Sequence, residues 1–265
     1  MTLDVVSFNV YVGLRSRGAP VRERAAEFCR RLTELDVDVL LLQEVWTAPL
    51  LRFIAARLPS LPHAAWLPGL AGHPAGGLAV LARRPLCPPT YTPFTSARPD
   101  GGGLPFRVVS ALRCRLQGVL AVRTVDGTLL VGNTQLTANG DGDWSAANRH
   151  HGLHRRQVRI VQTALRAAGA HTMPLSVLGG DFNIASSGPL YPEIVEHGAW
   201  HDPLADAGRP TYRAEYLPPG RPAQRIDYLL VSGRPVLAAD LVLTEPAGSV
   251  GFLSDHLAPR VRLPE

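Results

Sequence analysis

The feature that most constrains the fold of this chain is a nearly unbroken apolar run, VDVLLL, at Val37 to Leu42. Such a run is typical of a strand that is buried on both faces. Before it, from Val21 to Leu35, apolar residues recur every three or four positions, which is the spacing of an amphipathic helix with Pro20 in its first turn. Leu3 to Phe8 comes earlier still and is predicted to be a strand. Strand, helix and strand in this order predict a parallel pair joined by a crossover helix.

The rest of the chain continues this mixture of strands and helices. The predicted strands Val119 to Val125 and Leu129 to Asn133 flank Asp126-Gly127, a strong hairpin signal. A helix is expected from about Ser145 to Ala168, and a long surface loop over the proline-rich interval from Pro85 to Pro105. Further elements are a helix at Leu50 to Leu58 and strands at Leu78 to Ala82, Leu175 to Leu178, Ile226 to Val231, Val236 to Leu243 and Leu257 to Leu263. Because no repeat or clear linker divides the chain, residues 1–265 are predicted to form one mixed α/β domain.

Composition excludes several classes of protein. With 46% apolar and 18% charged residues the chain lies in the ordinary globular range. No stretch of about 18 apolar residues is present to span a membrane, and the opening MTLDVVSFNV lacks the basic and long apolar parts of a signal peptide. Cys29, Cys87 and Cys114 are odd in number and far apart, which favours reduced thiols over disulfides or a cysteine zinc site. We therefore expect a cytoplasmic protein, and the sequence does not indicate an oligomeric state.

The net charge of +5 and a pI near 9.5 are compatible with a phosphate-rich partner. However, the sequence contains no lysine, so that every basic residue is an arginine. Together with abundant alanine, glycine and proline, this indicates a coding bias, and the charge is weak evidence for a polyanionic partner.

Polar residues gather at the ends of the predicted strands. Asn9 follows the first strand, and Glu44 follows the buried apolar run, where a lone carboxylate would be costly. Asp181 and Asn183, in GGDFN, follow another strand, and alternation along an extended chain would point both side chains to the same side. The sequence Ser254-Asp255-His256 directly precedes the last strand. Because ligands collect at strand ends in α/β sheets, we expect these clusters to converge on one site.

The residue types in these clusters point to phosphate ester chemistry. Glu44, Asp255 and the amide of Asn9 are hard oxygen donors, which suit Mg²⁺ or Mn²⁺ and do not suit zinc. An oxygen-ligated divalent ion beside one histidine indicates metal-assisted hydrolysis of a phosphate ester. His256 would take a proton from the attacking water, and Asp227 in RIDYLLVS would hold its other ring nitrogen.

Asp181 and Asn183 complete this set, since they would align the water and hold a phosphoryl oxygen. Each residue by itself also has an ordinary structural explanation. Asn9 would cap a turn, Glu44 would cap a helix, and the segment from Asp181 to Asn183 would be a strand-to-loop turn. All these explanations would have to hold together, so convergence on one site is the preferred interpretation.

Five motifs in order resemble the endonuclease/exonuclease/phosphatase family of metal-dependent phosphoesterases. They are SFNV, LQE, GGDFN, IDY and SDH, and they extend from Asn9 to His256. The resemblance implies a four-layer α/β sandwich, with two mixed sheets packed face to face and helices outside. It also implies roles for individual residues: Glu44 as the principal metal ligand, Asn9 and Asp255 near the metal, Asp181 orienting the water, Asn183 contacting the phosphate, and Asp227 supporting His256 as the base.

One motif departs from the family's pattern. In many members an NTHL motif supplies a second active-site histidine, whereas this chain has NTQL with Gln135 at that position. Glutamine can donate a hydrogen bond to a phosphoryl oxygen but cannot titrate. Gln135 is therefore predicted to bind substrate and not to act as an acid.

Other segments suggest a substrate class. Gly76 to Pro85, Gln117 to Leu120 and Arg156-Gln157 resemble the neutral sphingomyelinase-like branch of the family, which cleaves a phosphodiester in a lipid headgroup. We therefore expect a lipid headgroup or another small phosphodiester as substrate. A metal-dependent DNA or RNA nuclease is the main alternative, favoured by the net charge. A non-catalytic module that binds phosphate-bearing ligands is a third hypothesis, motivated by the glutamine in NTQL, and the retained base argues against it.

A second group of candidates lies on the helix predicted within Ser145 to Ala168. Three histidines one turn apart would suggest zinc, but they lack a glutamate and a further ligand nearby, so a solvated helix start is preferred: His150, His151 and His154. The arginines of this segment are predicted to be solvated or ion-paired, because no aromatic residues are interleaved for base stacking: Arg149, Arg155, Arg156 and Arg159.

Overall fold

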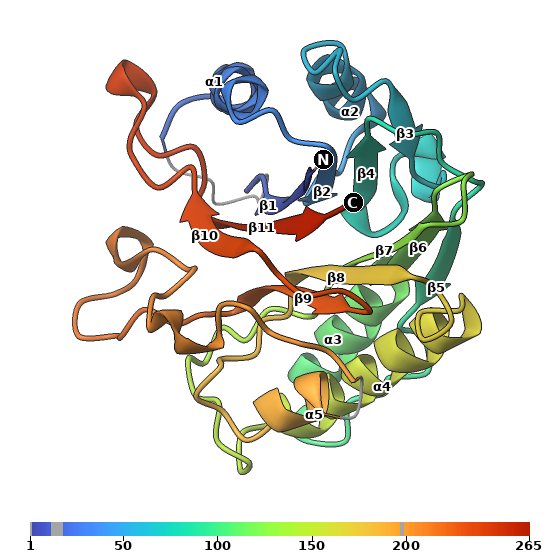
Figure 1. The fold of residues 1–265 in the computed structure, drawn as a ribbon. Helices are drawn as coiled ribbons and strands as arrows, with labels where there is room; N and C mark the ends of the chain where they lie inside the picture. Colours follow the sequence, from blue (N-terminus) through green and yellow to red (C-terminus); the bar gives the residue numbers. More distant parts are fainter. Residues whose placement is uncertain (1, 12–17, 197–198) are drawn as a thin grey trace.

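Two mixed β-sheets stacked face to face occupy the centre of the molecule (Figure 1). The computed structural model describes residues 2–11, 18–196 and 199–265. The first sheet has the strand order β10 (Ala238–Val242), β11 (Ala258–Pro264), β1 (Thr2–Asn9), β2 (Val39–Gln43), β4 (Ala79–Ala82) and β3 (His63–Ala65). The second has the order β5 (Thr90–Pro93), β6 (Gly118–Arg123), β7 (Leu129–Gln135), β8 (Leu175–Asp181) and β9 (Asp227–Ser232).

Helices cover the outer faces of the two sheets (Figure 1). The first sheet is covered by α1 (Val21–Glu34) and α2 (Ala48–Ala55), and the second by α3 (Leu104–Leu116), α4 (His151–Ala167) and α5 (Tyr191–Val195). Single turns of 3₁₀ helix lie in the connections: η1 (Leu70–Gly72), η2 (Ala75–Gly77), η3 (Ala205–Ala207), η4 (Ala214–Tyr216) and η5 (Gly248–Val250). This arrangement confirms the predicted four-layer α/β sandwich.

Both faces of the central strands are buried, which explains their apolar residues at consecutive positions. In β2, Val39 and Leu41 pack between the two sheets, whereas Leu40 and Leu42 belong to the cluster formed with α1 and α2. Full burial of a side chain of this size contributes roughly 1.5–3 kcal/mol to stability. The parallel pairing of β1 with β2 across α1 is as predicted from this run.

Strand direction decides which residues meet at the edge of the sandwich. β1 is parallel to β2, and β7 is parallel to β8. β11 runs antiparallel to β1, and β9 runs antiparallel to β8. In each sheet, therefore, the C-terminal ends of two parallel strands lie beside the N-terminal end of a third, reversed strand. The predicted hairpin around Asp126-Gly127 is confirmed as the antiparallel pair β6 and β7.

A buried polar contact joins the two sheets beneath this edge. Gln43 at the end of β2 donates from Nε2 to Oδ1 of Asn133 in β7, at 2.8 Å, and to Oγ of Ser7 at 3.1 Å. Asn133 donates from Nδ2 to the carbonyl oxygens of Leu42 and Ala79, both at 2.9 Å. Because buried polar groups are costly when unpaired, this network favours one alignment of the sheets.

The prediction of a loop over Pro85 to Pro105 is wrong at two places. Thr90–Pro93 forms the edge strand β5, where a proline is tolerated because its nitrogen needs no partner on the open side. At the other end, α3 begins at Leu104, with Gly103 as its N-cap and Pro105 in its first turn, a position that suits proline.

The helix predicted from Ser145 begins later, at His151. Side chains of the preceding segment bind backbone N–H groups and hold it in turns. Oδ1 of Asp143 accepts a hydrogen bond from Ser145 N, and Oδ1 of Asn148 accepts one from His150 N, both at 2.8 Å. Such local bonds compete with helix formation.

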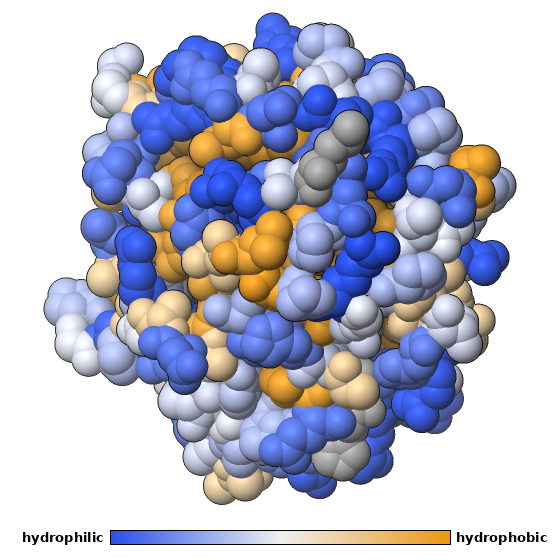
Figure 2. Space-filling model, viewed as in Figure 1, coloured by the Kyte–Doolittle hydropathy of each residue, from blue (hydrophilic) through white to orange (hydrophobic). Residues whose placement is uncertain are grey.

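Three features bear on the inferences from composition: the hydropathy of the surface, the length of the apolar helices and the state of the cysteines. Figure 2 shows the face viewed in Figure 1 as largely hydrophilic, with hydrophobic residues exposed mainly near its middle. Across the described ranges, none of the helices combines the length and the apolarity needed to cross a bilayer. Cys29, Cys87 and Cys114 are free thiols.

Candidate active site

The predicted polar clusters meet at one edge of the sandwich. Asn9 is the last residue of β1, and Asp181 is the last residue of β8 in the other sheet. Nδ2 of Asn9 donates to Oδ2 of Asp181 at 3.2 Å and to Oε1 of Glu44 at 3.3 Å. Gln135, which ends β7, donates from Nε2 to the same Glu44 oxygen at 2.9 Å. The ends of four strands, two from each sheet, therefore bring these side chains together.

The reversed strands add the remaining acids and the histidine. Asp227 is the first residue of β9 and lies opposite Asp181 in the register of β8 and β9. Asp255 and His256 lie just before β11, separated from it by Leu257, and β11 is the antiparallel neighbour of β1. The convergence expected from the sequence is therefore present, and all eight predicted residues lie in one network of contacts.

His256 and Asp227 form a buried pair. Nδ1 of His256 lies 2.9 and 3.0 Å from the two Asp227 carboxylate oxygens, close enough for the N–H to donate to either. The backbone of Asp227 is also held, since its N–H donates to Oγ1 of Thr211 at 2.9 Å. The other ring nitrogen, Nε2, lies 3.9 Å from Oδ2 of Asp181 and 3.8 Å from Oδ1 of Asp255. This arrangement fixes the ring and directs Nε2 toward two more carboxylates.

Burial and like charge control protonation in this cluster. Burial raises the pKa of Asp181 to about 7, and the charges of Asp227 and Glu44 add to the rise. Burial also raises the pKa of Asp255. For His256, burial disfavours the charged ring, but the surrounding carboxylates outweigh that effect and raise its pKa well above the ordinary value. The cluster thus holds more negative charge than its histidine can balance.

The donor set of this cluster fits a divalent cation. Glu44, Asp181 and Asp255 line one pocket and offer it carboxylate oxygens, the ligands that Mg²⁺ and Mn²⁺ prefer. Ligand atoms of Asp181, Asp227 and His256 lie within 4.8 Å of one another. Among the residues that the structure describes, Oε1 of Gln135 has no hydrogen-bond partner although it is buried beside Glu44. An unpaired buried acceptor at an acidic cluster is a further feature that a bound cation would satisfy.

The explanation given for Asn183 from the sequence is wrong. β8 ends at Asp181, and Asn183 adopts a φ of 50°, so strand alternation does not set its direction. Instead, Oδ1 of Asp181 accepts a hydrogen bond from Asn183 N at 3.0 Å, and Nδ2 of Asn183 donates to the carbonyl of Leu136 at 3.1 Å. A turn, not an extended segment, therefore brings both side chains to the same pocket.

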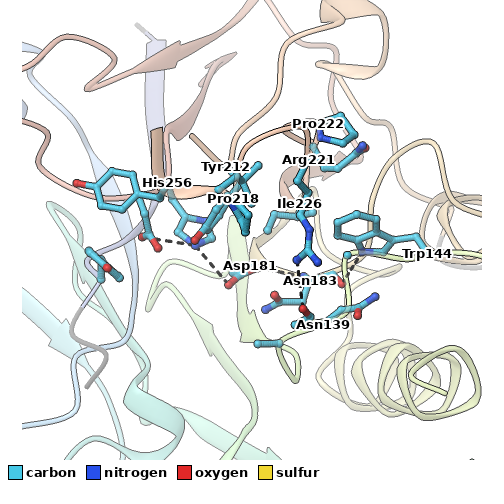
Figure 3. Close-up of a pocket in the computed structure, with 18 of the residues that line it drawn as sticks. Asn139, Trp144, Asp181, Asn183, Tyr212, Pro218, Arg221, Pro222, Ile226 and His256 are labelled. Atoms are coloured by element: carbon cyan, nitrogen blue, oxygen red, sulfur yellow. Dashed lines mark hydrogen bonds and ion pairs between the residues drawn. The ribbon is translucent and has the colours of Figure 1, made fainter. Parts of the chain in front are cut away.

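The cluster opens into a pocket of about 350 Å³. Figure 3 shows His256 and Asp181 at one side of it and Trp144 at the other, with Asn183 between them. Arg221 extends toward Asn183 and Asn139 from the loop that carries Pro218 and Pro222 (Figure 3). The pocket therefore combines a charged floor with a wall of apolar and aromatic residues, among them Tyr212, Tyr216, Leu217 and Ile226.

Several residues that hold the site were not found from the sequence. Arg24 of α1 is buried and donates to the carbonyl oxygens of Val10 at 2.9 Å and Leu253 at 2.7 Å, which joins the segment after β1 to the segment before β11. Arg213, also buried, donates to the carbonyl of Ser254 at 3.0 Å. Both side chains bind backbone carbonyls far away in sequence, and no local pattern indicates such contacts.

The histidines of α4 differ from expectation. His150 and His154 are buried, so the predicted solvated helix start is wrong at these two positions. Nε2 of His154 lies 2.7 Å from the carbonyl of Thr137, whose loop covers this part of the helix. The prediction for the arginines is confirmed. Arg159 is exposed, and the other three form ion pairs with acids: Arg149 with Asp141, Arg155 with Glu193, and Arg156 with Asp100.

Comparison with known structures agrees with this fold. Sphingomyelinase C from Streptomyces griseocarneus is 18% identical, with a TM-score of 0.69 and coverage of 100% of both chains. TDP2 of D. rerio, complexed with a single strand DNA product, is 16% identical, with a TM-score of 0.68 and coverage of 100% of this chain and 99% of that one. An endonuclease/exonuclease/phosphatase from Beutenbergia cavernae is 23% identical, with a TM-score of 0.67 and coverage of 99% and 71%.

No curated protein gives a significant match to the sequence. The model of the Endonuclease/Exonuclease/phosphatase family, however, matches residues 6–256, which include every residue of the cluster described above. The chain therefore belongs to the endonuclease/exonuclease/phosphatase family and is a phosphoester hydrolase.

Proposed function

We propose that the protein is a divalent-metal-dependent phosphodiesterase in which His256 activates the attacking water. The observation that carries this proposal is the pair formed by Asp227 and His256, with Nε2 of His256 directed toward Asp181 and Asp255. A cation bound among the carboxylates would offset the rise that they cause in the pKa of His256. The neutral ring, held by Asp227, is then suited to act as a general base at the floor of an open pocket.

The proposed metal site consists of Glu44 and Asp255, with Asn9 beside them. Asn9 joins the site through Nδ2, which binds the carboxylates of Glu44 and Asp181 and aligns them. Mg²⁺ or Mn²⁺ bound there would polarise a phosphoryl oxygen and stabilise the charge that develops during hydrolysis. Gln135 donates to Glu44, so we assign it a role in positioning that carboxylate in addition to the predicted contact with substrate.

His256 and its neighbours would activate the water. A water that donates one hydrogen to Nε2 of His256 and the other to Oδ2 of Asp181 keeps a lone pair free to attack phosphorus. As the new P–O bond forms, Nε2 takes the first proton, and the bond to the leaving oxygen breaks with its electron pair on that oxygen. Asp227 accepts the Nδ1 hydrogen throughout and stabilises the imidazolium.

We assign Asn183 the role of binding the phosphate group of the substrate. Nδ2 uses one hydrogen for the carbonyl of Leu136, and the amide group lies on the pocket (Figure 3). Its second N–H is available to donate to a phosphoryl oxygen. Because this amide is already fixed by Leu136, little reorganisation is needed when substrate binds.

The substrate that we propose is a lipid headgroup or another small phosphodiester. Apolar groups beside the charged floor, among them Leu217 and Ile226, support a substrate with an apolar portion. The likeness to sphingomyelinase C supports it as well. The three free thiols support the expected reducing, cytoplasmic location.

The proposal is tested by a comparison of substrates under identical metal conditions. Turnover of sphingomyelin or lysophospholipid micelles would be measured beside turnover of plasmid and single-stranded DNA. Faster turnover of the lipid supports the proposed substrate class. Faster turnover of DNA would identify a nuclease, and no turnover of any phosphate ester would favour a module that only binds phosphate-bearing ligands.

A further inference from the structure

Helix α3 exposes an apolar row to solvent. Leu104, Val108, Leu112 and Leu116 are spaced four residues apart and are 73%, 51%, 54% and 50% exposed. Val109 beside them is 48% exposed. Large apolar side chains are usually exposed singly, so a row along a whole helix marks a surface that contacts something else.

The apolar row points away from the rest of the protein. The buried residues of α3 are Ser110 and Cys114, both small. Cys114 belongs to the hydrophobic cluster of the second sheet, and its Sγ lies 3.5 Å from Nε2 of Gln157 in α4. At about 100° per residue, the row lies roughly opposite this buried side. α3 thus packs on the protein along a narrow edge of small side chains, and within the described ranges its apolar row belongs to none of the hydrophobic clusters.

Three arginines accompany the row. At the same helical spacing, Arg107 and Arg113 lie on its two flanks, and Arg115 lies near its edge. All three are exposed, and none forms an ion pair with an acid in the ranges that the structure describes. The helix itself, LPFRVVSALRCRL, contains no acidic residue. An apolar face with cationic flanks is the pattern of a helix that lies in a membrane interface, where arginine stems cover apolar surface and their charges reach the headgroups.

We propose that α3 is a docking helix for a lipid surface that carries negative charge. Charge complementarity distinguishes this occupant from the alternatives. A second copy packed row against row would bring two sets of the three arginines together without an acid on either helix. A nucleic acid would use the arginines but would leave the apolar row against water, and it would find no aromatic side chain in the row to stack on.

The docking surface is connected to the pocket. Phe106, on the protein side of α3, packs edge-on against His150, and the guanidinium of Arg149 lies 4.7 Å above its ring. Arg149 is paired with Asp141, whose carbonyl accepts a hydrogen bond from Arg221 at 3.0 Å. Arg221 lines the pocket, so a short series of contacts joins α3 to the pocket wall. A membrane bound at α3 would therefore hold this part of the molecule near its surface, whichever phosphodiester the site cleaves.

The test measures co-sedimentation of the full chain with vesicles of phosphatidylcholine containing about 30% phosphatidylserine. We expect binding that decreases as salt is raised, and little binding to phosphatidylcholine alone. V108S/L112S should lower the partition coefficient about 10-fold or more, because two apolar side chains no longer enter the interface. R107Q/R113Q/R115Q should lower it on the order of 100-fold. Leu237→Ser, at an apolar residue that is 56% exposed elsewhere, should bind as the unaltered protein does.

Three results would overturn the docking proposal. They are no binding of the unaltered protein to the charged vesicles, binding that both α3 variants retain, and a dimer in light scattering that V108S/L112S dissociates while vesicle binding is absent. Circular dichroism confirms that each variant folds. Hydrolysis of a soluble diester should be unchanged in the α3 variants, and vesicle binding should be unchanged in His256→Ala. Failure of docking can therefore be distinguished from failure of the proposed catalytic function.

Discussion

The Asp227 carboxylate receives the Nδ1 hydrogen of His256 at 2.9 Å, across a separation of 29 residues. Both side chains are buried, and the contact joins the start of β9 to the segment before β11. The two sheets of the sandwich therefore each supply one member of the pair. Because the carboxylate fixes the ring, Nε2 is the nitrogen left for chemistry in the pocket.

The first prediction concerns this pair as a unit. Asp227→Asn should lower the rate of diester hydrolysis on the order of 10²-fold or more, because the amide cannot stabilise the imidazolium. When His256 is already alanine, Asp227→Asn should have little further effect, since residues that act together are not additive. Steady-state rates of the two single variants and the double variant give the comparison. Equal factors for Asp227→Asn in both backgrounds would show that Asp227 does not act through His256.

The second prediction concerns the cation. Mg²⁺ at about 100 times its Kd should stabilise the protein by about 2.7 kcal/mol, which raises Tm on the order of 5 °C. Glu44→Gln should remove most of this rise, because it removes a charged ligand and leaves the shape of the side chain. Glu215→Gln is the matched control, since this exposed acid lies near the pocket wall in η4 and is not in the cluster. Thermal unfolding with and without Mg²⁺ measures the effect, and an undiminished rise in Glu44→Gln would exclude the assigned ligand.

The third prediction concerns stability at acid pH. Burial lowers the pKa of His154 to about 4, whereas the unfolded chain has the ordinary value near 6.5. Between these values the unfolded chain binds a proton that the folded protein does not, so stability falls as pH falls from 6.5 to 4. The contribution of this residue is on the order of 3 kcal/mol.

His154→Gln keeps a donor for the Thr137 carbonyl and cannot titrate. Urea unfolding of the variant should therefore show a smaller loss of stability over this pH range than the unaltered protein. His171→Ala, at an exposed histidine after α4, should leave the pH dependence unchanged. Parallel curves for the unaltered protein and His154→Gln would contradict the assignment.

The fourth prediction concerns the hydrogen bonds by which buried Arg24 joins the segment after β1 to the segment before β11. Arg24→Met keeps much of the side-chain volume but leaves the carbonyls of Val10 and Leu253 without their donor. Unpaired buried carbonyls should lower the free energy of unfolding on the order of 3 kcal/mol. Arg30→Met, on an exposed face of the same helix, should change the free energy of unfolding far less, because its ion pairs are exposed to solvent. Urea unfolding measures both variants. A similar loss of stability in the two would contradict the stabilising role assigned to the Arg24 hydrogen bonds.

The motifs found in the sequence identify the site because each lies directly at a strand end. β1 and β8 put Asn9 and Asp181 at the same edge through strand direction alone, and strand direction follows from the order of the elements. Periodicity does not reveal backbone turns beyond a strand end or the partner of a single side chain. It therefore could not predict that Asn183 reaches the pocket through a positive φ, or that Gln135 at the end of β7 donates to Glu44.

Helix α3 is missing from the predicted elements, and the burial of His150 and His154 in α4 differs from the prediction, for related reasons. α3 has no apolar face toward the core, since its buried residues are Ser110 and Cys114, and its helical pattern was hidden behind proline and glycine. His150 and His154 are covered by a loop that includes Thr137, far away in sequence. Both outcomes depend on tertiary contacts that a local pattern does not contain.

The most direct measurement is hydrolysis of bis(p-nitrophenyl) phosphate by the purified protein, with Mg²⁺ and with excess EDTA. We predict turnover that requires the metal and that falls by about 10²–10⁴ in His256→Ala, while His171→Ala keeps the full rate. An unchanged rate in a folded His256→Ala variant, or equal turnover in EDTA, would contradict the proposal that these strand ends form one metal-dependent hydrolytic site.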